Sequence, residues 1–214
     1  MTDANHRALL SRIAKRSPDS EVAMTLLYRA LAGSVFAFVR RRMSYADDHE
    51  VQAVVVDTLY EVWRAAPDFA GDSLVKTWVL GIARHKALDA VRKNPHATTQ
   101  SHVDIDDFAD SLADQNADLL SILANRQRAQ QLDYCMSLLP MEQRECLHLL
   151  LVEGLSVKDI ALVQNCPSGT VKTRVFHAKA KLKASLAQWL NEDRGLKQPG
   201  YSGARQMTDR RNLQ

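Results

Sequence analysis

Six polar or basic residues gather in the last third of the chain, at positions where they could contact nucleic acid. In the same segment, apolar residues recur at intervals of four, three and four, at Val171, Val175, Ala178 and Leu182. This spacing predicts a helix whose apolar stripe faces the protein. The polar set must then lie on the sides of this helix or away from the protein. It suits the major groove of DNA, where side chains reach base edges and phosphates. Its members are Thr170, Lys172, Thr173, Arg174, His177 and Lys179.

Two short helices joined by a turn are predicted to position this set. The first runs from about Val157 to Gln164 and ends in the turn Asn165-Cys166-Pro167, and the second continues through Lys183. This is the anatomy of a helix-turn-helix. Arg174 and Lys179 are better placed for phosphates or for pairing within the protein than for base edges. An ordinary helical hairpin with a solvated basic face is the alternative that the pattern alone leaves open.

The rest of the chain also predicts helices. Glycines and prolines are few, at 8 and 6, and no alternating run of strand length occurs. Apolar residues at helical spacing predict helices over about 20–42, 50–66 and 75–93, and a further helix from Pro140 to Gly154. The helix over 50–66 shows Glu50, Asp57 and Glu61 on the side opposite its apolar stripe. We therefore expect an all-α fold.

A change in composition separates two helical blocks. From Asn94 to Asn125 there is no Lys or Arg, while Asp104, Asp106, Asp107, Asp110, Asp114 and Asp118 accumulate. This predicts an acidic, flexible linker, which is most simply a solvated connector. The predicted organisation is an amino-terminal segment over 1–19, a first domain over 20–93, the linker over 94–127, a second domain over 128–190 and a mobile tail over 191–214.

Composition narrows the class of protein. Apolar residues make up 46% and charged residues 25%, which is typical of a folded protein with a core. The net charge of +3 is too mild to indicate a nucleic-acid partner by itself. We find no signal-peptide pattern and no apolar stretch of the ~20 residues that a membrane span needs. The expectation is a cytoplasmic protein without membrane insertion.

The residues of common catalytic and metal sites are missing or badly spaced. No Gly-rich phosphate loop, HExxH motif or nucleophile-base arrangement stands out, so neither an enzyme nor a cofactor is expected. Cys135, Cys146 and Cys166 are odd in number and do not form a CxxC framework, which favours reduced, buried thiols. A metal site that joins Cys146 and His148 to Cys135 or Cys166 is an alternative, although its spacing is not that of a zinc module.

Motifs in both blocks resemble one protein family. Five motifs of the second block resemble region 4 of extracytoplasmic-function (ECF) sigma factors. They are Leu139-Pro140, Gln143-Arg144-Glu145, Glu153-Gly154-Leu155-Ser156, Asp159-Ile160-Ala161 and Gly169-Thr170-Val171-Lys172-Thr173-Arg174. Region 2 of the same family resembles Thr58-Leu59, Trp63, Phe69, Lys76-Thr77-Trp78 and the run from Ile82 to Arg92. A lone helix-turn-helix is shared by many regulators, but two such blocks in this order are specific. The resemblance implies a sigma region 2 helical bundle and a region 4 helix-turn-helix.

The resemblance also implies roles for the first block. Region 2 of the family binds the polymerase clamp through its second helix, here with Glu50, Asp57 and Glu61. It captures a flipped base of the -10 element and holds the melted strand, which requires cations and polar atoms. Trp78 could stack on a base, although a core position is favoured. The corresponding residues are Asp72, Ser73, Lys76, Arg84, His85, Lys86, Arg92 and Lys93.

For the second block, the resemblance implies recognition of the -35 element by the helix that carries Lys172, Thr173 and His177. The sequence departs from the family at His177, where Arg is common, and at Val56, where Gln is frequent. The implied partners are core RNA polymerase, promoter DNA and an anti-sigma factor. Two other hypotheses are a sigma-like decoy that binds an anti-sigma factor and a stand-alone helix-turn-helix regulator.

Overall fold

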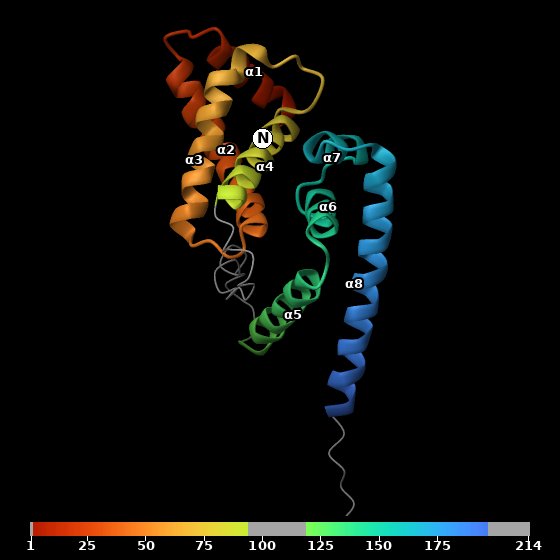
Figure 1. The fold of residues 1–214 in the computed structure, drawn as a ribbon. Coiled ribbons are helices and arrows are strands. Elements are labelled where there is room, and N and C mark those ends of the chain that lie inside the picture. The colour runs from red at the N-terminus through yellow and green to blue at the C-terminus, as the bar shows by residue number, and fades with distance from the viewer. Residues whose placement is uncertain (1, 94–118, 197–214) are drawn as a thin grey trace, which may run out of the picture.

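The computed structural model describes residues 2–93 and 119–196, and of residues 119–127 and 190–196 it describes only the helical backbone. The described ranges contain helices and no strand, so the all-α prediction is confirmed (Figure 1). The elements are α1 (Asp3–Ala14), α2 (Ser20–Arg42), α3 (Asp48–Ala65), the 3-10 helix η1 (Ala66–Asp68), α4 (Val75–Lys93), α5 (Leu119–Ser137), α6 (Met141–Leu151), α7 (Val157–Gln164) and α8 (Ser168–Leu196).

Two predicted segments fall largely outside these ranges. The six aspartates of the predicted linker and residues 197–214 of the predicted tail are not among the described residues. Helix α5 begins at Leu119, inside the range expected for the linker, and α8 continues to Leu196, inside the range expected for the tail. Helix α1 lies in the amino-terminal segment, where no helix was predicted.

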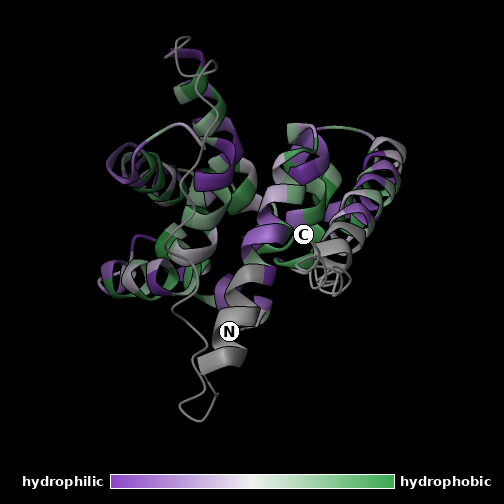
Figure 2. Cartoon of the chain, turned by 90° about the horizontal axis from the view of Figure 1, so that it is seen from below, coloured by the Kyte–Doolittle hydropathy of each residue, from purple (hydrophilic) through white to green (hydrophobic). Residues whose placement is uncertain are grey.

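Helices α1 to α4 form the first bundle. Helix α3 shows why the local sequence folds in this way, because Val51, Val55 and Val62 are buried on one face. Its first turn is closed by a capping box: Asp47 Oδ1 accepts a hydrogen bond from the Glu50 N–H at 2.8 Å, and Glu50 Oε2 accepts one from the Asp47 N–H at 3.3 Å. Figure 2 shows hydrophobic and hydrophilic residues on different sides of the same helices.

Helix α2 lies at the centre of this bundle. By length and composition alone it could cross a membrane, so the expectation that no stretch would meet this criterion was wrong. In the structure it packs against α1, α3, α4 and α6. Leu27, Leu31, Val35 and Phe38 are each at most 2% exposed. The apolar side chains of α2 therefore form part of the protein core.

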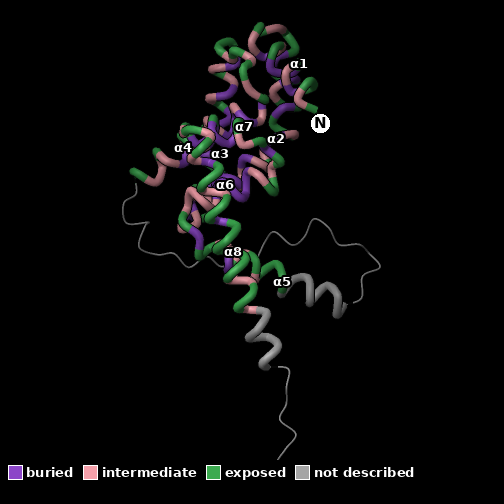
Figure 3. The backbone as a smooth tube through the Cα atoms, turned by 90° about the vertical axis from the view of Figure 1, so that its right-hand side faces the viewer, coloured by how far each residue is buried: buried purple, intermediate pink, exposed green. Residues whose placement is uncertain are grey.

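Helices α6, α7 and α8 form the second block. Ser156 and Asp159 make a capping box at the start of α7, and Asn165 ends this helix in the left-handed conformation at φ 49°. Helix α8 then packs against α6 and α7. Val171 and Ala178 are fully buried and Val175 and Leu182 are partly buried, which confirms the predicted stripe. In Figure 3, the described part of α8 beyond Ala178 is exposed or intermediate, with no buried residue over 179–189.

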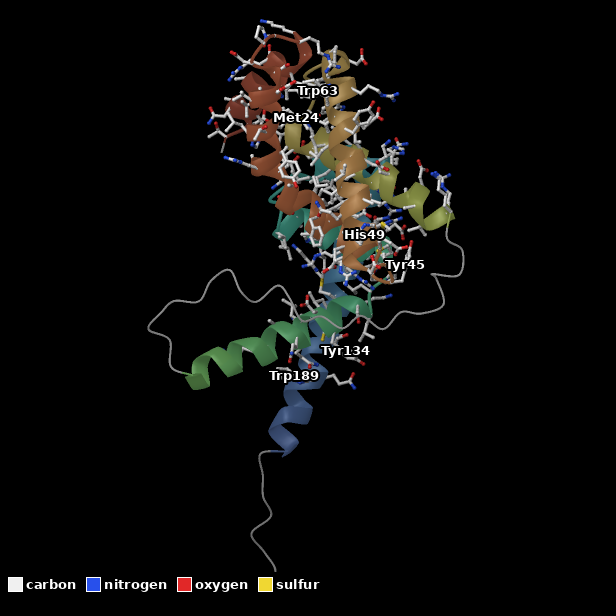
Figure 4. The ribbon with its side chains drawn as sticks, turned by 90° about the vertical axis from the view of Figure 1, so that its left-hand side faces the viewer. Met24, Tyr45, His49, Trp63, Tyr134 and Trp189 are labelled. Atoms are coloured by element: carbon white, nitrogen blue, oxygen red, sulfur yellow. The ribbon has the colours of Figure 1, made fainter. Side chains whose placement is uncertain are left out.

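The two blocks pack against each other through α4 and α7 and through α2 and α6. One hydrophobic cluster continues from Val79 and Leu80 on α4 to Ile160 and Val163 on α7. Figure 4 labels Trp63 in the first bundle, and Tyr134 on α5 and Trp189 on α8 at the other end of the molecule. One face of α4 is therefore covered by α7 of the second block.

Candidate nucleic-acid interface

The amino-terminal half of α8 presents the predicted major-groove set to solvent. Lys172, Thr173, His177 and Lys179 are exposed. Thr170 and Arg174 are half-buried, and Arg174 Nη1 donates a hydrogen bond to Gln164 Oε1 at 2.7 Å. Pairing within the protein is one of the two roles expected for Arg174. Because α7 and the buried stripe hold α8 from behind, its exposed residues form a rigid, basic surface.

Phe176 belongs to this surface but was not among the candidate residues. Its side chain is 70% exposed, and its ring lies edge-on to His177 with centroids 5.5 Å apart. An exposed apolar ring beside cations suits the methyl group of thymine in the major groove. Its position outside the apolar stripe of α8 was the sequence signal that could have identified it.

The predicted -10 residues do not share one surface. Asp72, His85, Arg92 and Lys93 are exposed, and Ser73 is half-buried in the loop before α4. Arg92 pairs with Asp89, three residues earlier on α4. The ring centroids of Trp78 and Phe69 lie 5.1 Å apart, and both rings pack against the core, as favoured for Trp78.

Two cations of this set face the second block instead of solvent. Lys76 Nζ lies 2.5 Å from Glu153 Oε2, and Arg84 Nε donates to Glu145 Oε1 at 2.9 Å. The other oxygen of Glu145 accepts a hydrogen bond from Arg42 Nη1 at 2.8 Å. The Glu145 side chain is 4% exposed and the two arginines are 10% and 12% exposed. One buried carboxylate therefore joins α2, α4 and α6.

Glu153 has a strongly shifted pKa in the same interface. Burial acts to raise the pKa of Glu153, but interactions with His148 and Lys76 more than offset it and lower the pKa to about 2. Nearby, Thr77 Oγ1 donates a hydrogen bond to Asp159 Oδ1 at 3.1 Å, and Thr77 is 1% exposed. These contacts are charge-rich and largely shielded from water.

The acidic residues of α3 have different environments. Glu50 serves the capping box, Asp57 is exposed, and Glu61 accepts hydrogen bonds from Arg64 at 2.7 Å and Lys86 at 3.3 Å. The Arg64 hydrogen bond lowers the pKa of Glu61, and the Lys86 hydrogen bond adds to this effect. Lys86 is thus bound within the first bundle. The exposed side of α3 also carries Val56 and Tyr60, at 54% and 65% exposure.

The three cysteines are free thiols. Cys146 donates a hydrogen bond to Gln164 Oε1 at 3.1 Å, and burial raises its pKa to about 11 although Arg174 acts in the opposite direction. Such a thiol is a poor nucleophile at neutral pH. Within the described residues, no three His, Cys, Asp or Glu side chains are placed to hold a metal ion.

Comparisons with known families identify both blocks. Residues 27–96 match the family model for sigma-70 region 2, and residues 129–182 match the model for sigma-70, region 4. Together these matches span more than half of the chain. Curated relatives similar along most of their length include the ECF RNA polymerase sigma-E factor of Escherichia coli, with 27% identity over 177 residues, 81% of this chain and 90% of the relative. The chain belongs to the ECF sigma factors of the sigma-70 family.

Other relatives agree with this assignment. The RNA polymerase sigma-H factor of Pseudomonas aeruginosa is 28% identical over 200 residues, which is 90% of this ECF sigma factor and 99% of the relative. A solved structure of the sigma factor RpoE with the anti-sigma factor NepR from Bartonella quintana has a TM-score of 0.57 and 25% identity, and covers 76% of this chain and 96% of that one. The structure of CnrH with the cytosolic domain of CnrY shares the fold, with a TM-score of 0.57, 22% identity and coverage of 86% and 98%.

Proposed function

We propose that this ECF sigma factor binds core RNA polymerase and directs it to promoters with a -35 and a -10 element. The exposed basic surface at the start of α8 is the observation that carries the proposal. In this account the first domain, over 20–93, acts as region 2 and the second, over 128–190, acts as region 4. The chemistry of nucleotide addition belongs to the polymerase.

Helix α8 reads the -35 element as duplex DNA. Lys172, Thr173 and His177 are exposed near its amino end, where they can enter the major groove. Thr170 and Lys179 lie at the sides and suit phosphates. His177 cannot read guanine as bidentately as Arg does, and the Phe176 ring beside it favours a thymine methyl. We therefore expect a -35 element that contains thymine at the position facing Phe176.

The loop over 69–74 and helix α4 hold the melted -10 strand. Asp72 is exposed and Ser73 is half-buried, so both can offer polar atoms to an unstacked base. Arg92 and Lys93 form an exposed cationic end of α4 that suits the phosphates of a single strand, and the exposed His85 ring lies about two turns earlier on the helix, where it can offer a hydrogen bond. The phosphates can also bind three further cations, Lys76, Arg84 and Lys86, after these side chains are released from the carboxylates that they now pair with.

The outward side of α3 contacts polymerase. Asp57 is exposed between the exposed apolar side chains of Val56 and Tyr60. A surface of this kind can combine apolar burial with pairing to a basic residue of the partner. Glu61 contributes its remaining acceptor capacity, while Glu50 fixes the start of the helix. Asp57 is the acidic residue of this set that we expect to contribute most to polymerase binding.

An anti-sigma factor regulates this protein in the cytoplasm, as part of a response to stress or to the environment. Two structural neighbours were solved in complexes, one with an anti-sigma factor and one with the cytosolic domain of a partner. The complex with an anti-sigma factor supports an anti-sigma partner for this chain. A partner that covers α8 and the outward side of α3 would prevent binding to both DNA and polymerase.

In vitro transcription tests the proposal. The full chain is added to core RNA polymerase and pooled genomic DNA of the host, and new start sites are mapped. Defined starts that share two upstream elements are the expected result. Binding to polymerase without any new starts would contradict it, and would favour the decoy or the stand-alone regulator. The matched variant Asp57→Asn should reduce the starts by weakening polymerase binding, with -35 duplex binding unchanged.

A further inference from the structure

Helix α1 is bonded to the loop that precedes α4. Arg7 Nη1 donates a hydrogen bond to the Gly71 carbonyl at 3.0 Å, and Nη2 donates one to the Ser73 carbonyl at 2.6 Å. The same guanidinium lies 5.7 Å from the centroid of the Phe69 ring. One side chain thus contacts the loop at three residues, from a helix more than sixty residues earlier in the sequence.

Asp3 completes this contact at the start of α4. Its Oδ1 accepts a hydrogen bond from the Val75 N–H at 2.9 Å, and its Oδ2 accepts one from Arg7 Nε at 2.6 Å. Val75 is the first residue of α4, and the N–H groups in the first turn of a helix have no partner within the helix. Burial acts to raise the pKa of Asp3, but the bonds to Arg7 and Val75 lower it, so the carboxylate stays charged.

The loop between these anchors needs an external support. Gly71 has φ +84°, and its Cβ, if present, would lie 3.2 Å from Arg7 Nη1. Residues 70–73 of the loop make no backbone–backbone hydrogen bond that the structure records, and Arg7 binds the carbonyls of Gly71 and Ser73 instead. Asp72, which we assign to the -10 base, lies between the two carbonyls that Arg7 binds.

We propose that Asp3 and Arg7 are positioning residues that hold the loop over 69–74 in the shape that recognises an unpaired -10 base. This inference rests on the function proposed above. It predicts that breaking the Asp3–Arg7 pair weakens the preference for the matched base, because base selectivity needs polar atoms fixed to within a fraction of an ångström. It also gives α1 a part in promoter recognition without any contact with DNA.

The test uses holoenzyme and single-stranded oligonucleotides that carry each of the four bases at the selective -10 position. Arg7→Ala should reduce the preference for the matched base by about tenfold, the equivalent of one lost hydrogen bond. Arg12→Ala is the control, because Arg12 lies on the same helix, pairs with Asp19 at 3.2 Å and has the same side-chain exposure of 41%. Arg7→Lys should restore part of the preference, since it keeps the charge but not the forked geometry.

Three results have distinct meanings. A lost preference in Arg7→Ala with -35 duplex binding intact supports the positioning role. An unchanged preference, even in a less stable variant, overturns it. If the wild-type holoenzyme itself shows no base preference and no defined start sites, the proposed function fails and not only this inference.

A different observation carries a second inference, about the covered face of α4. Glu145 binds Arg84, and Glu153 binds Lys76 through its side chain and, at 3.3 Å, through its carbonyl oxygen. Two carboxylates of the second block therefore bind cations that we assign to the phosphates of the melted strand. We infer that the second block competes with single-stranded -10 DNA for α4 while the blocks are packed together, an inference that rests on the proposed role of α4.

The competition is measured with the isolated full chain and a fluorescent single-stranded -10 oligonucleotide. The double variant Glu145→Gln/Glu153→Gln should bind about tenfold more tightly than wild type, since it removes the carboxylates that occupy Arg84 and Lys76. Glu142→Gln is the control, because Glu142 lies on the same helix as Glu145 but pairs with Arg42 of α2, at 3.6 Å, and not with a cation of α4. If the double variant does not fold, Thr77→Val, which removes only the hydrogen bond to Asp159, should raise the affinity by a smaller factor. No increase in any folded variant overturns the competition, and transcription by the wild type tests the proposed function separately.

Discussion

Two surfaces of this molecule carry the same kinds of side chain but differ in what surrounds them. Lys172, His177 and Lys179 on α8 are exposed and form no ion pair with any residue that the structure describes. Lys76 and Arg84 on α4 are paired with carboxylates of the second block. A sequence motif thus identifies cations that could bind DNA, but the tertiary packing decides whether each cation is free to do so. The two faces should respond differently to mutation, salt and pH.

The largest expected effect is on the free energy of unfolding, and it comes from the face of α4 that the second block covers. Glu145→Ala leaves Arg42 and Arg84 buried without their shared carboxylate, so we expect the free energy of unfolding to fall by about 3 kcal/mol. Urea unfolding of the full chain measures this. Glu142→Ala is the matched control, because its side chain is 41% exposed and its loss should cost less than about 1 kcal/mol. Equal losses in the two variants would contradict the contrast between buried and exposed pairs.

The pH dependence of stability should come next. The folded-state pKa of Glu153 is about 2 against an ordinary value of 4.5, so the unfolded state binds more protons between these values. The stability that Glu153 provides is complete above pH 4.5 and is lost as the pH falls towards 2. Each such group contributes at most about 1.4 kcal/mol per pH unit.

Glu153→Gln should flatten this part of the acid unfolding curve, as followed by circular dichroism. Asp89→Asn is a suitable comparison, because Asp89 is also paired but is 52% exposed. A curve with the same slope in Glu153→Gln and wild type would show that the interface carboxylate does not couple to folding.

On the open surface, the effect should appear in binding and not in folding. Lys172→Ala should weaken binding to -35 duplex DNA by about 1 kcal/mol and reduce the salt dependence by roughly one counterion, with the unfolding free energy unchanged. Fluorescence anisotropy at several salt concentrations measures both quantities. Lys183→Ala is the control, since Lys183 is exposed on the same helix about three turns farther along. Equal losses would indicate a diffuse basic surface instead of a specific reading end.

The smallest effect is expected at the exposed end of α4. Asp89→Asn removes a surface pair with Arg92, whose side chain is 74% exposed, and should change the unfolding free energy by less than about 0.5 kcal/mol. The measurement is the same urea titration. A loss comparable to that of Glu145→Ala would mean that exposure does not separate the two kinds of pair.

Helical spacing was enough to predict most elements of the two blocks. The stripe of α8 is buried as expected, and the exposed basic set follows from it. These features depend on neighbours three or four residues apart, which the sequence displays directly. The motifs, and their order along the chain, predicted the protein family, and the comparisons confirmed this prediction.

Contacts between distant residues were not predictable in the same way. Arg84 and Glu145 are 61 residues apart and Arg7 and Gly71 are 64 apart, and no periodicity relates them. Glu145 was assigned only to a motif, and Arg84 only to DNA. Helix α1 was missed although Leu9, Leu10 and Ile13 are buried and Asp3 and Arg7 are spaced for an i,i+4 pair. Those two signals together could have identified it.

Helix α8 has a mechanical consequence. It is one continuous helix of 29 residues, so it is about 43 Å long, and Figure 1 shows it extending from α7 past α5. A rod of this length acts as a lever. A small tilt where α8 packs against α6 moves its far end by several ångströms, so an optical label at that end would report the angle at which the reading end meets a promoter.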